Sequence, residues 1–337
     1  MTSLVHALAA PTLVVGPDER LVAMNDPFAA LVGAGQLGKH YITTLRQPAV
    51  ADAIASVLAG GPPVQTRYFL RDGSKDTVYD VKVAPAGDCV VLSFEDQSAA
   101  EDAGQMRRDF VANVSHELRT PLTALLGFIE TLTGAARDDP AARDRFLQIM
   151  AHEANRMTRL VDDLLSLSRV ESDARVRPLE PVDLGGVLAS VIKGLEPQAS
   201  AAGVTVSLSV PDATQTIPGD AGQLAQVFAN LIENGLKYGA RGGVLSVVLD
   251  AAQMQTKLRA NGVRICVSDS GEGIAEHHLA RLTERFYRVD NHRSRAVGGT
   301  GLGLAIVKHI VNRHRGKLTI ESTLGQGTQV SVFLPSH

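Results

Sequence analysis

Two apolar stripes with helical spacing, separated by a short polar turn, constrain the fold of this chain most strongly. The stripes are Phe110, Val114, Leu118, Leu122, Leu125, Ile129 and Leu132, and then Phe146, Met150, Met157, Leu160, Leu164 and Leu167. Apolar residues three or four positions apart line one face of a helix. The intervening TGAARDDP contains a glycine and a proline, so the pattern predicts an antiparallel helical hairpin over residues 98–172. Because two helices bury little apolar area, we expect a second copy of the chain to complete a four-helix bundle in a homodimer.

The segment before the hairpin mixes strand and helix patterns. Residues 1–97 contain strand-like runs in PTLVVGPDERLVAMN, TVYDVKVAP and DCVVLSFED, with turn residues between them. The stretch NDPFAALVG is typical of a capped helix start, with Asp26 as the cap and Pro27 at the first helical position. These patterns predict a small α/β unit with an antiparallel sheet, of the kind used for sensing.

The segment after the hairpin reads as a second α/β domain over residues 178–337, separated from it by the polar linker SDARVRP. Strand-like runs are VTVSLSV, GVLSVVLD, GVRICVSD, KLTIES and TQVSVFLP. Helical patterns cover residues 184–201, 220–238 and 302–315. The expected fold class is therefore multidomain α+β, with three domains at 1–97, 98–172 and 178–337.

Composition limits the functions that this chain can have. A length of 337 residues suggests two or three domains, and a hydrophobic content of 45% excludes a disordered chain. The net charge of −3 gives no electrostatic reason to expect direct nucleic-acid binding. No apolar run reaches the roughly 20 residues of a membrane helix. We expect the chain as given to be cytoplasmic, and a membrane tether or membrane sensor partner upstream stays open.

A carboxylate followed by glycines ends one strand of the last domain. In SDSGEGI, Asp269 follows an apolar strand and precedes Gly271 and Gly273. Glycines let the backbone pass close to a flat ligand, and a carboxylate can accept a hydrogen bond from an exocyclic amine such as that of adenine. The alternative is an ordinary tight turn after a strand.

A glycine-rich stretch leads into the last helix. In GGTGLGLAIVKHIVNRH, Gly299, Gly301 and Gly303 precede an apolar-periodic helix, whose first N–H groups suit phosphates. The spacing and the polar segment before it do not fit the dinucleotide or P-loop motifs. A flexible loop before a helix is the alternative.

Polar side chains share one face of the helix in QLAQVFANLIENGLKYG. Asn230, Asn234 and Lys237 lie on one strip, away from the apolar face. Amide oxygens and an ammonium group can hold a magnesium ion and phosphate oxygens. Taken alone, the stretch also fits a solvated helix face.

The first helix of the hairpin carries a histidine in SHELRTPL. An exposed neutral imidazole can accept a phosphoryl group at neutral pH, because its pKa is about 6.5. Glu117 follows His116 and can hydrogen-bond the other ring nitrogen, which would set the tautomer. Pro121 removes a helical hydrogen bond, and we infer that the resulting bend lets the histidine segment move; a packing kink is the alternative.

Taken together and in this order, these motifs resemble the sensor histidine kinases. SHELRTPL matches the phosphoacceptor box, and the later stretches match the N, G1, F and G2 boxes and the final glycine turn of a Bergerat-type ATP site. The resemblance covers residues 101–335. It implies catalytic roles for His116, Glu117 and Thr120, and a magnesium ligand in Asn234. The implied ATP-binding residues are Asn230, Asn234, Lys237, Tyr238, Asp269, Gly271, Gly273, Ile274, Phe286, Arg288, Gly299, Thr300, Gly301, Leu302, Gly303 and Thr328.

The resemblance also implies a mobile lid, and the sequence differs from the family pattern at one position. Phe286 would anchor the lid, and Arg288, Arg293 and Arg295 would place positive charge near phosphates; solvated loop charge is the alternative for these arginines. Gly235 stands where the family usually has alanine, which is expected to weaken the helix by about 1 kcal/mol.

What the resemblance implies about function is specific. The chain would be a homodimeric kinase that uses Mg-ATP to phosphorylate His116. It would then transfer the phosphoryl group to an aspartate of a response-regulator receiver domain, and Thr120 would help it to dephosphorylate that regulator. Residues 1–97 resemble a PAS sensor domain, and the hairpin is most similar to phosphate-regulon sensor kinases. The competing interpretations are an ATP-driven clamp of the gyrase or chaperone type and a silent dimeric scaffold.

Overall fold

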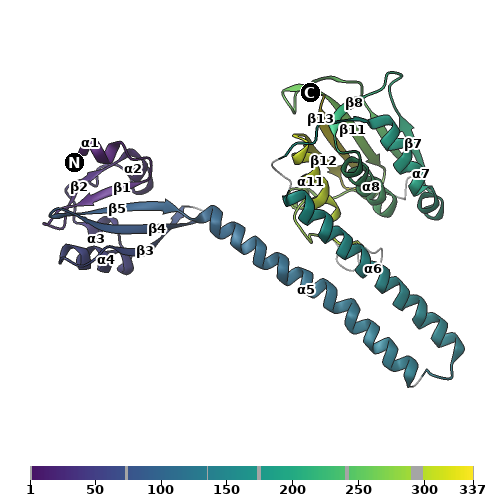
Figure 1. Ribbon diagram of the computed structural model, residues 1–337, viewed down its shortest axis with the longest axis horizontal. Helices are drawn as coiled ribbons and strands as arrows, with labels where there is room; N and C mark the ends of the chain where they lie inside the picture. Colours follow the sequence, from purple (N-terminus) through teal and green to yellow (C-terminus); the bar gives the residue numbers. More distant parts are fainter. Residues whose placement is uncertain are drawn as a thin grey trace. The chain divides into compact units, whose positions relative to one another are not determined.

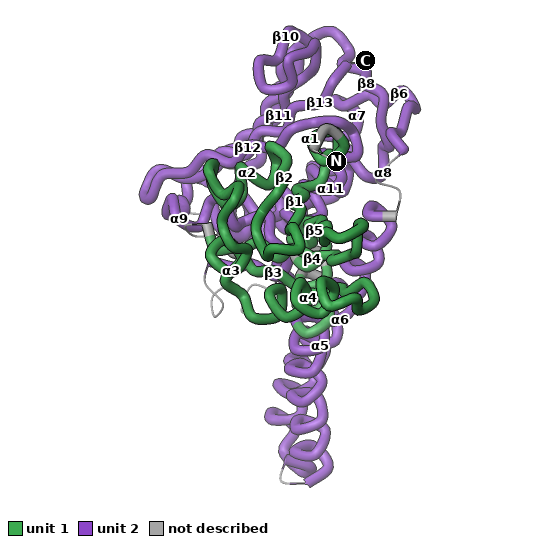
Figure 2. Tube along the Cα trace, turned by 90° about the vertical axis from the view of Figure 1, so that its left-hand side faces the viewer, with its two compact units in different colours: residues 1–112 green, residues 113–337 purple. Residues whose placement is uncertain are grey.

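The structure is a computed structural model that describes residues 2–72, 75–134, 136–172, 176–239, 243–289 and 299–336. The chain divides into two compact units, residues 1–112 and residues 113–337, which Figure 2 shows in different colours. Among the described residues, no helix is both long enough and apolar enough to cross a membrane.

The first unit is built on a five-stranded antiparallel sheet with the strand order β2-β1-β5-β4-β3. Its strands are β1 (Thr12–Val15), β2 (Leu21–Met24), β3 (Val64–Asp72), β4 (Lys75–Ala86) and β5 (Cys89–Asp96). Its helices are α1 (Thr2–His6), α2 (Asp26–Val32), α3 (Tyr41–Thr44) and α4 (Pro48–Leu58). The alternation of buried and exposed residues along β5 places Val90, Leu92 and Phe94 in the main core under the helices.

One predicted detail of this unit is wrong. The cap of α2 is Asn25, not Asp26, because the Asn25 side chain accepts the N–H of Phe28 at 3.1 Å. The same oxygen accepts the N–H of Thr12 at 2.9 Å, and the Asn25 amide donates to the carbonyls of Leu8 and Ala10. Asp26 therefore starts the helix, and an asparagine that binds three neighbouring segments supplies the cap.

The predicted hairpin consists of two long helices, α5 (Ser98–Thr133) and α6 (Pro140–Ser172), which Figure 1 shows running antiparallel. Helix α5 begins in the first unit and ends in the second, and Pro121 lies inside it. Near the turn the rings of Phe128 and Phe146 stack with centroids 5.3 Å apart. Several apolar side chains of the hairpin remain exposed, namely Leu122, Leu126, Ile129, Leu147, Val161 and Leu165.

The remainder of the second unit is an α/β sandwich. Its large sheet has the order β12-β13-β11-β9-β7, with β10 added beside β11, and β6 pairs with β8 in a small second sheet. The strands are β6 (Glu180–Asp183), β7 (Thr205–Ser209), β8 (Thr216–Gly219), β9 (Val244–Leu249), β10 (Gln253–Gln255), β11 (Ala260–Asp269), β12 (Lys317–Thr323) and β13 (Gly327–Pro335). The helices are α7 (Leu184–Ala202), α8 (Ala221–Tyr238), α9 (Glu276–Leu279) and α11 (Gly303–Arg313).

Helix α8 positions the candidate site because one of its faces is fixed by the core. Leu224, Phe228 and Leu231 are buried, as the apolar pattern predicts. The strip with Asn230 and Asn234 therefore faces away from that core. Figure 1 shows α7, α8 and α11 lying in front of the large sheet.

Candidate active site

The carboxylate of Asp269 is held in one orientation at the end of β11. Its Oδ1 accepts the N–H of Gly271 at 2.8 Å and the N–H of Thr328 at 3.3 Å. Thr328 is also its register partner on β13. Within the part of the chain that the structure describes, Oδ2 has no hydrogen-bond partner. A fixed carboxylate with one free oxygen can select an amine donor on a flat ligand.

The end of α8 lies against Asp269, and a glycine that the sequence analysis missed makes this possible. A Cβ on Gly239 would be 2.3 Å from the Cβ of Asp269. Gly271 packs on the same spot, beside the carbonyl of Tyr238. Any larger residue at 239 would push the α8 end away from the carboxylate. The signal was present in the sequence, because a glycine directly after a helix is a common terminator.

Asn230 joins α8 to the start of α11. Its Nδ2 is buried without a hydrogen-bond partner among the described residues. Its Oδ1 lies 3.4 Å from the position of a Cβ on Gly303, the first residue of α11. A buried amide donor without a partner costs about 1–3 kcal/mol, so this group is suited to a phosphate oxygen of a bound nucleotide. Lys237 instead pairs with Glu233 at 2.8 Å, and Asn234 is half-buried on the same helix.

The glycine-rich stretch before α11 interlocks with Phe286. The N–H of Phe286 donates to the carbonyl of Gly301 at 2.9 Å, and Phe286 has a φ of 63°. Gly301 has a φ of 74°, and a Cβ there would lie 2.9 Å from the Cα of Phe286. Only glycine fits this position without strain. Leu302 is fully buried beneath the loop, and Gly299 is the first residue described after the segment that contains Arg293 and Arg295. Those two arginines lie outside the described residues.

Ser322, a residue that the sequence analysis missed, and the predicted Thr328 fix the other side of the cup formed by Asp269, Asn230 and the glycines. The N–H of Ile274, just after Gly273, donates to Oγ of Ser322 at 2.8 Å. Ser322 in turn donates to the carbonyl of Gly327 at 2.8 Å and lies 2.9 Å from Oγ1 of Thr328. Sequence gave no reason to single out a serine in a strand, because its role depends on two loops that meet only in the folded domain.

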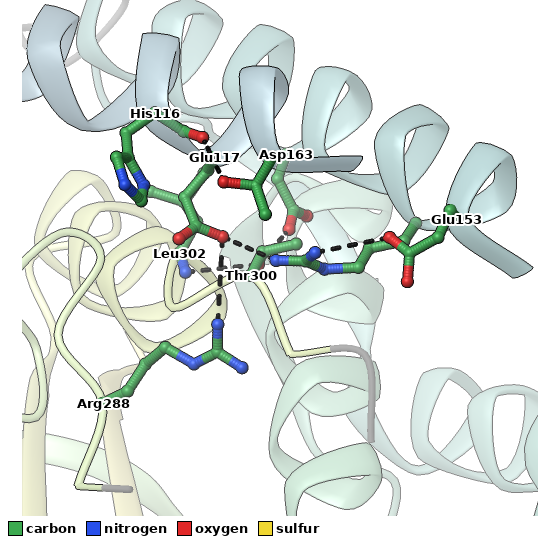
Figure 3. Close-up of polar contacts among 9 residues, drawn as sticks. His116, Glu117, Glu153, Asp163, Arg288, Thr300 and Leu302 are labelled. Carbon is green, nitrogen blue, oxygen red and sulfur yellow. Dashed lines mark hydrogen bonds and ion pairs between the residues drawn. The ribbon is translucent and has the colours of Figure 1, made fainter. Parts of the chain in front are cut away.

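His116 is exposed on α5, as expected for a phosphoryl acceptor. Oγ1 of Thr120 donates to the His116 carbonyl at 3.1 Å, so the two residues share a face. Within the described residues, the Glu117 carboxylate does not bind the His116 ring, which the sequence analysis expected, and contacts two arginines instead. Its Oε2 accepts from Nη2 of Arg156 at 2.6 Å and lies 3.9 Å from Nη1 of Arg288 (Figure 3). In the described part of the chain, the His116 ring makes no hydrogen bond.

The α/β sandwich contacts α6 through polar groups. Oγ1 of Thr300 donates to Oδ2 of Asp163 at 2.7 Å and accepts the N–H of Leu302 at 3.3 Å (Figure 3). Burial raises the pKa of Asp163, and the hydrogen bond from Thr300 partly opposes that shift. Arg285 pairs with Glu171, and Ser166 donates to Gln226 at 2.8 Å. A residue of the glycine-rich stretch is thereby tied to the helical hairpin.

The two parts of this site correspond to two known domain families. Residues 106–173 match the His Kinase A (phospho-acceptor) domain, and residues 219–337 match the histidine kinase-, DNA gyrase B- and HSP90-like ATPase. The fold and the site thus combine a phospho-acceptor hairpin with an ATP-binding domain, the two domains from which histidine kinases are built. The second match implies ATP binding, and it accounts for the cup formed by Asp269, Asn230 and the glycines.

Two curated relatives show to which family the chain belongs. The chain is 40% identical over 248 residues to the phosphate regulon sensor protein PhoR of Pseudomonas aeruginosa. This match covers 73% of this chain and 54% of PhoR. It is 36% identical over 247 residues to the sensor-like histidine kinase SenX3 of Mycolicibacterium smegmatis, covering 73% of this chain and 62% of that protein. The chain belongs to the sensor histidine kinases. It spans little more than half the length of these two relatives.

A solved structure has the same fold. The histidine kinase ThkA, in a crystal structure with the response regulator protein TrrA, superposes with a TM-score of 0.54 over 100% of this chain and 98% of that chain, at 20% identity. At this identity the likeness concerns the fold alone.

Proposed function

We propose that the chain phosphorylates itself on His116 with Mg-ATP and then passes the phosphoryl group to an aspartate of a response-regulator receiver domain. The observation that carries the proposal is the meeting of the two halves of the site. The exposed His116 is followed by Glu117, whose carboxylate lies 3.9 Å from Arg288 of the ATP domain. Phosphoryl transfer depends on positioning and on neutralising charge, and these residues can do both.

The residues of this chain divide the work between them. Asp269 would select adenine through its free Oδ2, and Asn230 and the N–H groups at the start of α11 would bind phosphate oxygens. A magnesium ion, held by the Asn234 amide oxygen, would neutralise phosphate charge. The neutral His116 ring would form a nitrogen–phosphorus bond while the bond to the leaving ADP oxygen breaks. Thr120, on the same helix face, would orient water for the reverse task of dephosphorylating the regulator.

Incubation with ATP labelled at the γ-phosphate tests this function. We expect an acid-labile, base-stable phosphoprotein that is absent in His116→Ala and retained in His152→Ala, a matched exposed histidine on the other helix of the hairpin. An ATP-driven clamp would hydrolyse ATP without retaining the label, and a silent scaffold would do neither. Label that persists in His116→Ala would refute the assignment of the acceptor.

A homodimer is proposed because the hairpin leaves an apolar stripe uncovered. Leu122, Leu126 and Ile129 are 45–54% exposed on α5 and lie at helical spacing. A second hairpin would cover them by forming a four-helix bundle. Light scattering of the full chain should give twice the monomer mass, and a monomer at micromolar concentration would contradict this proposal.

The regulator and the signal are inferred from the relatives. The 40% identity to PhoR supports a role in phosphate-starvation signalling, in which any DNA-binding output belongs to the regulator. Profiling the phosphorylated chain against purified receiver domains tests this idea. The fastest removal of label should occur with a regulator of phosphate genes, and equal rates with unrelated receivers would refute it.

We further propose that residues 1–97 form a PAS-like sensor domain. The support is the antiparallel strand order β2-β1-β5-β4-β3 with the helices α2 to α4 packed on one face. A cleft of about 380 Å³ opens between this helical layer and β3, and its wall combines apolar and polar groups. Lys39 and Arg46 are its charged lining residues, so a small organic anion is the class of signal to screen. A panel of carboxylates and phosphate esters that leaves the melting temperature unchanged would argue against it.

A further inference from the structure

Arg156 is a nearly buried cation in the middle of α6, and the proposed chemistry has so far assigned it no role. Its side chain is 8% exposed. Nη2 donates to Glu117 across the hairpin at 2.6 Å, and Nη1 lies 3.5 Å from Glu153 on its own helix. It also lies beside Glu117, Pro121 and Thr300, around a space that is too small for a water molecule. A buried guanidinium requires such anionic partners, because removing a charge from water costs several kcal/mol.

The contact with Glu117 competes with the contact that the reaction needs. Glu117 can support phosphorylation by accepting a hydrogen bond from the His116 ring. In this structure Oε2 of Glu117 accepts a hydrogen bond from Arg156 and forms a longer ion pair with Arg288, and the two arginine side chains are 8% and 6% exposed. Figure 3 shows the Glu117 carboxylate directed toward Arg288, with the His116 ring to one side.

Two arginines from different elements form ion pairs with Glu117. Arg156 projects from α6, where Glu153 pairs with its other Nη atom, and Arg288 projects from the loop after α9. Arg156 makes the shorter contact by more than 1 Å, as the distances of 2.6 Å and 3.9 Å show. It also lies in the same hairpin as Glu117, so this ion pair does not depend on the position of the ATP domain.

We infer that Arg156 is a positioning residue that holds the Glu117 carboxylate away from His116 until the site is assembled for transfer. Release of this ion pair would allow Glu117 to accept the hydrogen of a His116 ring nitrogen. The inference deepens the proposed function and rests on it. It predicts that Arg156 controls the basicity of His116 through Glu117, although Arg156 makes no hydrogen bond to His116 in the described structure.

The pKa of His116, measured by NMR on the full nucleotide-free chain with labelled histidine, tests the inference. The chain has ten histidines, and His116→Ala assigns the signal. In Arg156→Met the carboxylate, which Arg156 no longer holds, should raise the pKa of His116 by about 0.5–1 unit, because a nearby anion favours imidazolium. Arg156→Lys should keep the pKa near that of the wild type. Arg159→Met, an exposed arginine that bonds only within its own helix, is the matched control and should change nothing.

Two further variants make the test independent of the folding of Arg156→Met. Glu117→Gln alone should leave the pKa of His116 unchanged, because Glu117 does not contact His116 before release. Glu117→Gln combined with Arg156→Met should abolish the rise. A fall in the pKa in Glu117→Gln, or a rise that survives in the double variant, would overturn the inference.

The autophosphorylation rate supplies a second readout. Because the neutral ring is the acceptor, the acid limb of the rate profile in Arg156→Met should move to higher pH by the same amount as the pKa of His116. The plateau rate should rise by about threefold or more, since Glu117 then already contacts the ring. An unchanged pKa together with an unchanged profile would refute the role of Arg156. Absence of any label on His116 would refute the proposed function instead, while the NMR result would still report on Arg156.

Discussion

The nucleotide cup and the histidine site of this kinase are built in opposite ways. Every side of the cup includes contacts to backbone groups, because Asp269 accepts two N–H donors, Gly301 fits against the backbone of Phe286, and Ser322 accepts the N–H of Ile274. The charged groups of the histidine site are held by contacts between side chains. His116 is exposed, and its neighbour Glu117 is held by cations from another helix and another domain.

This difference indicates which half is preorganised. Backbone contacts cannot rearrange without local unfolding, so the cup is ready for nucleotide before it binds. Long side chains can exchange partners at a cost of about 0–1 kcal/mol at exposed sites and more when buried. Regulation should therefore act on the histidine site, while substitutions in the cup should act on nucleotide binding whatever the state of His116.

The largest effect is expected for Asp269→Asn. The asparagine oxygen can still accept the N–H of Gly271, but its NH2 group then faces the adenine amine, which is also a donor. The affinity for an ATP analogue should therefore fall about 100-fold. An inosine analogue, with a carbonyl in place of that amine, should lose much less. Calorimetric titration measures both.

His116→Ala and Asp250→Ala are the controls for that measurement. The first removes the acceptor site, and the second removes an acidic residue that pairs only loosely with Arg264, at 3.8 Å. Both should bind the ATP analogue within about twofold of the wild type. A large loss in His116→Ala would show that the two halves are not separable.

Gly301→Ala should destabilise the cup by about 2 kcal/mol. It combines a positive φ of 74° with a contact of 2.9 Å to the Phe286 backbone. Gly325→Ala is the matched control, because Gly325 has a φ of 80° but nothing within 4 Å of an added Cβ. Urea unfolding should show the smaller loss for Gly325→Ala, and equal losses would assign the whole effect to φ.

Gly235→Ala should lower the free energy of unfolding by a smaller amount, although helix propensity alone would raise it. An added Cβ would lie 2.4 Å from Cδ1 of Leu245, which is 1% exposed. Overpacking costs about 1–3 kcal/mol and offsets the gain of about 1 kcal/mol from alanine. Adding Leu245→Val should recover stability. If Gly235→Ala alone stabilises the chain in urea, Leu245 has room to move.

The smallest effect is a pH dependence that comes from His314, at the end of α11 opposite the cup. This buried ring accepts the N–H of Asp220 at 3.0 Å and donates to the Ile310 carbonyl at 2.8 Å. Burial lowers the pKa of His314 in the folded state. The unfolded chain thus binds the extra proton first, and the free energy of unfolding should fall as the pH drops below about 6.5.

Thermal melts between pH 7.5 and 5.5 measure this dependence, and His314→Gln should flatten it. A melting temperature that falls equally in both proteins would place the pH dependence elsewhere.

The residues that the sequence identified in advance are those whose chemistry can be read locally. The helical stripes predicted α5 and α6 to within a few residues, and the apolar face of α8 was confirmed. The strands β6, β8 and β10 were missed because they are three or four residues long and have little alternation. Gly239 and Ser322 were missed because the contacts of each are with residues distant in sequence, and Asn25 was missed because the adjacent Asp26 is an equally suitable cap by residue type.

The sequence by itself determined the family, the helical hairpin, and the presence of a histidine acceptor and a glycine-lined ATP domain, because periodicity and motif spacing are properties of consecutive residues. The tertiary structure decided what those residues touch. It placed Glu117 against Arg156 and Arg288, tied Thr300 to Asp163, and filled the space beside Gly235 with Leu245. Such contacts depend on how separate helices and strands pack, and no local pattern in the chain encodes them.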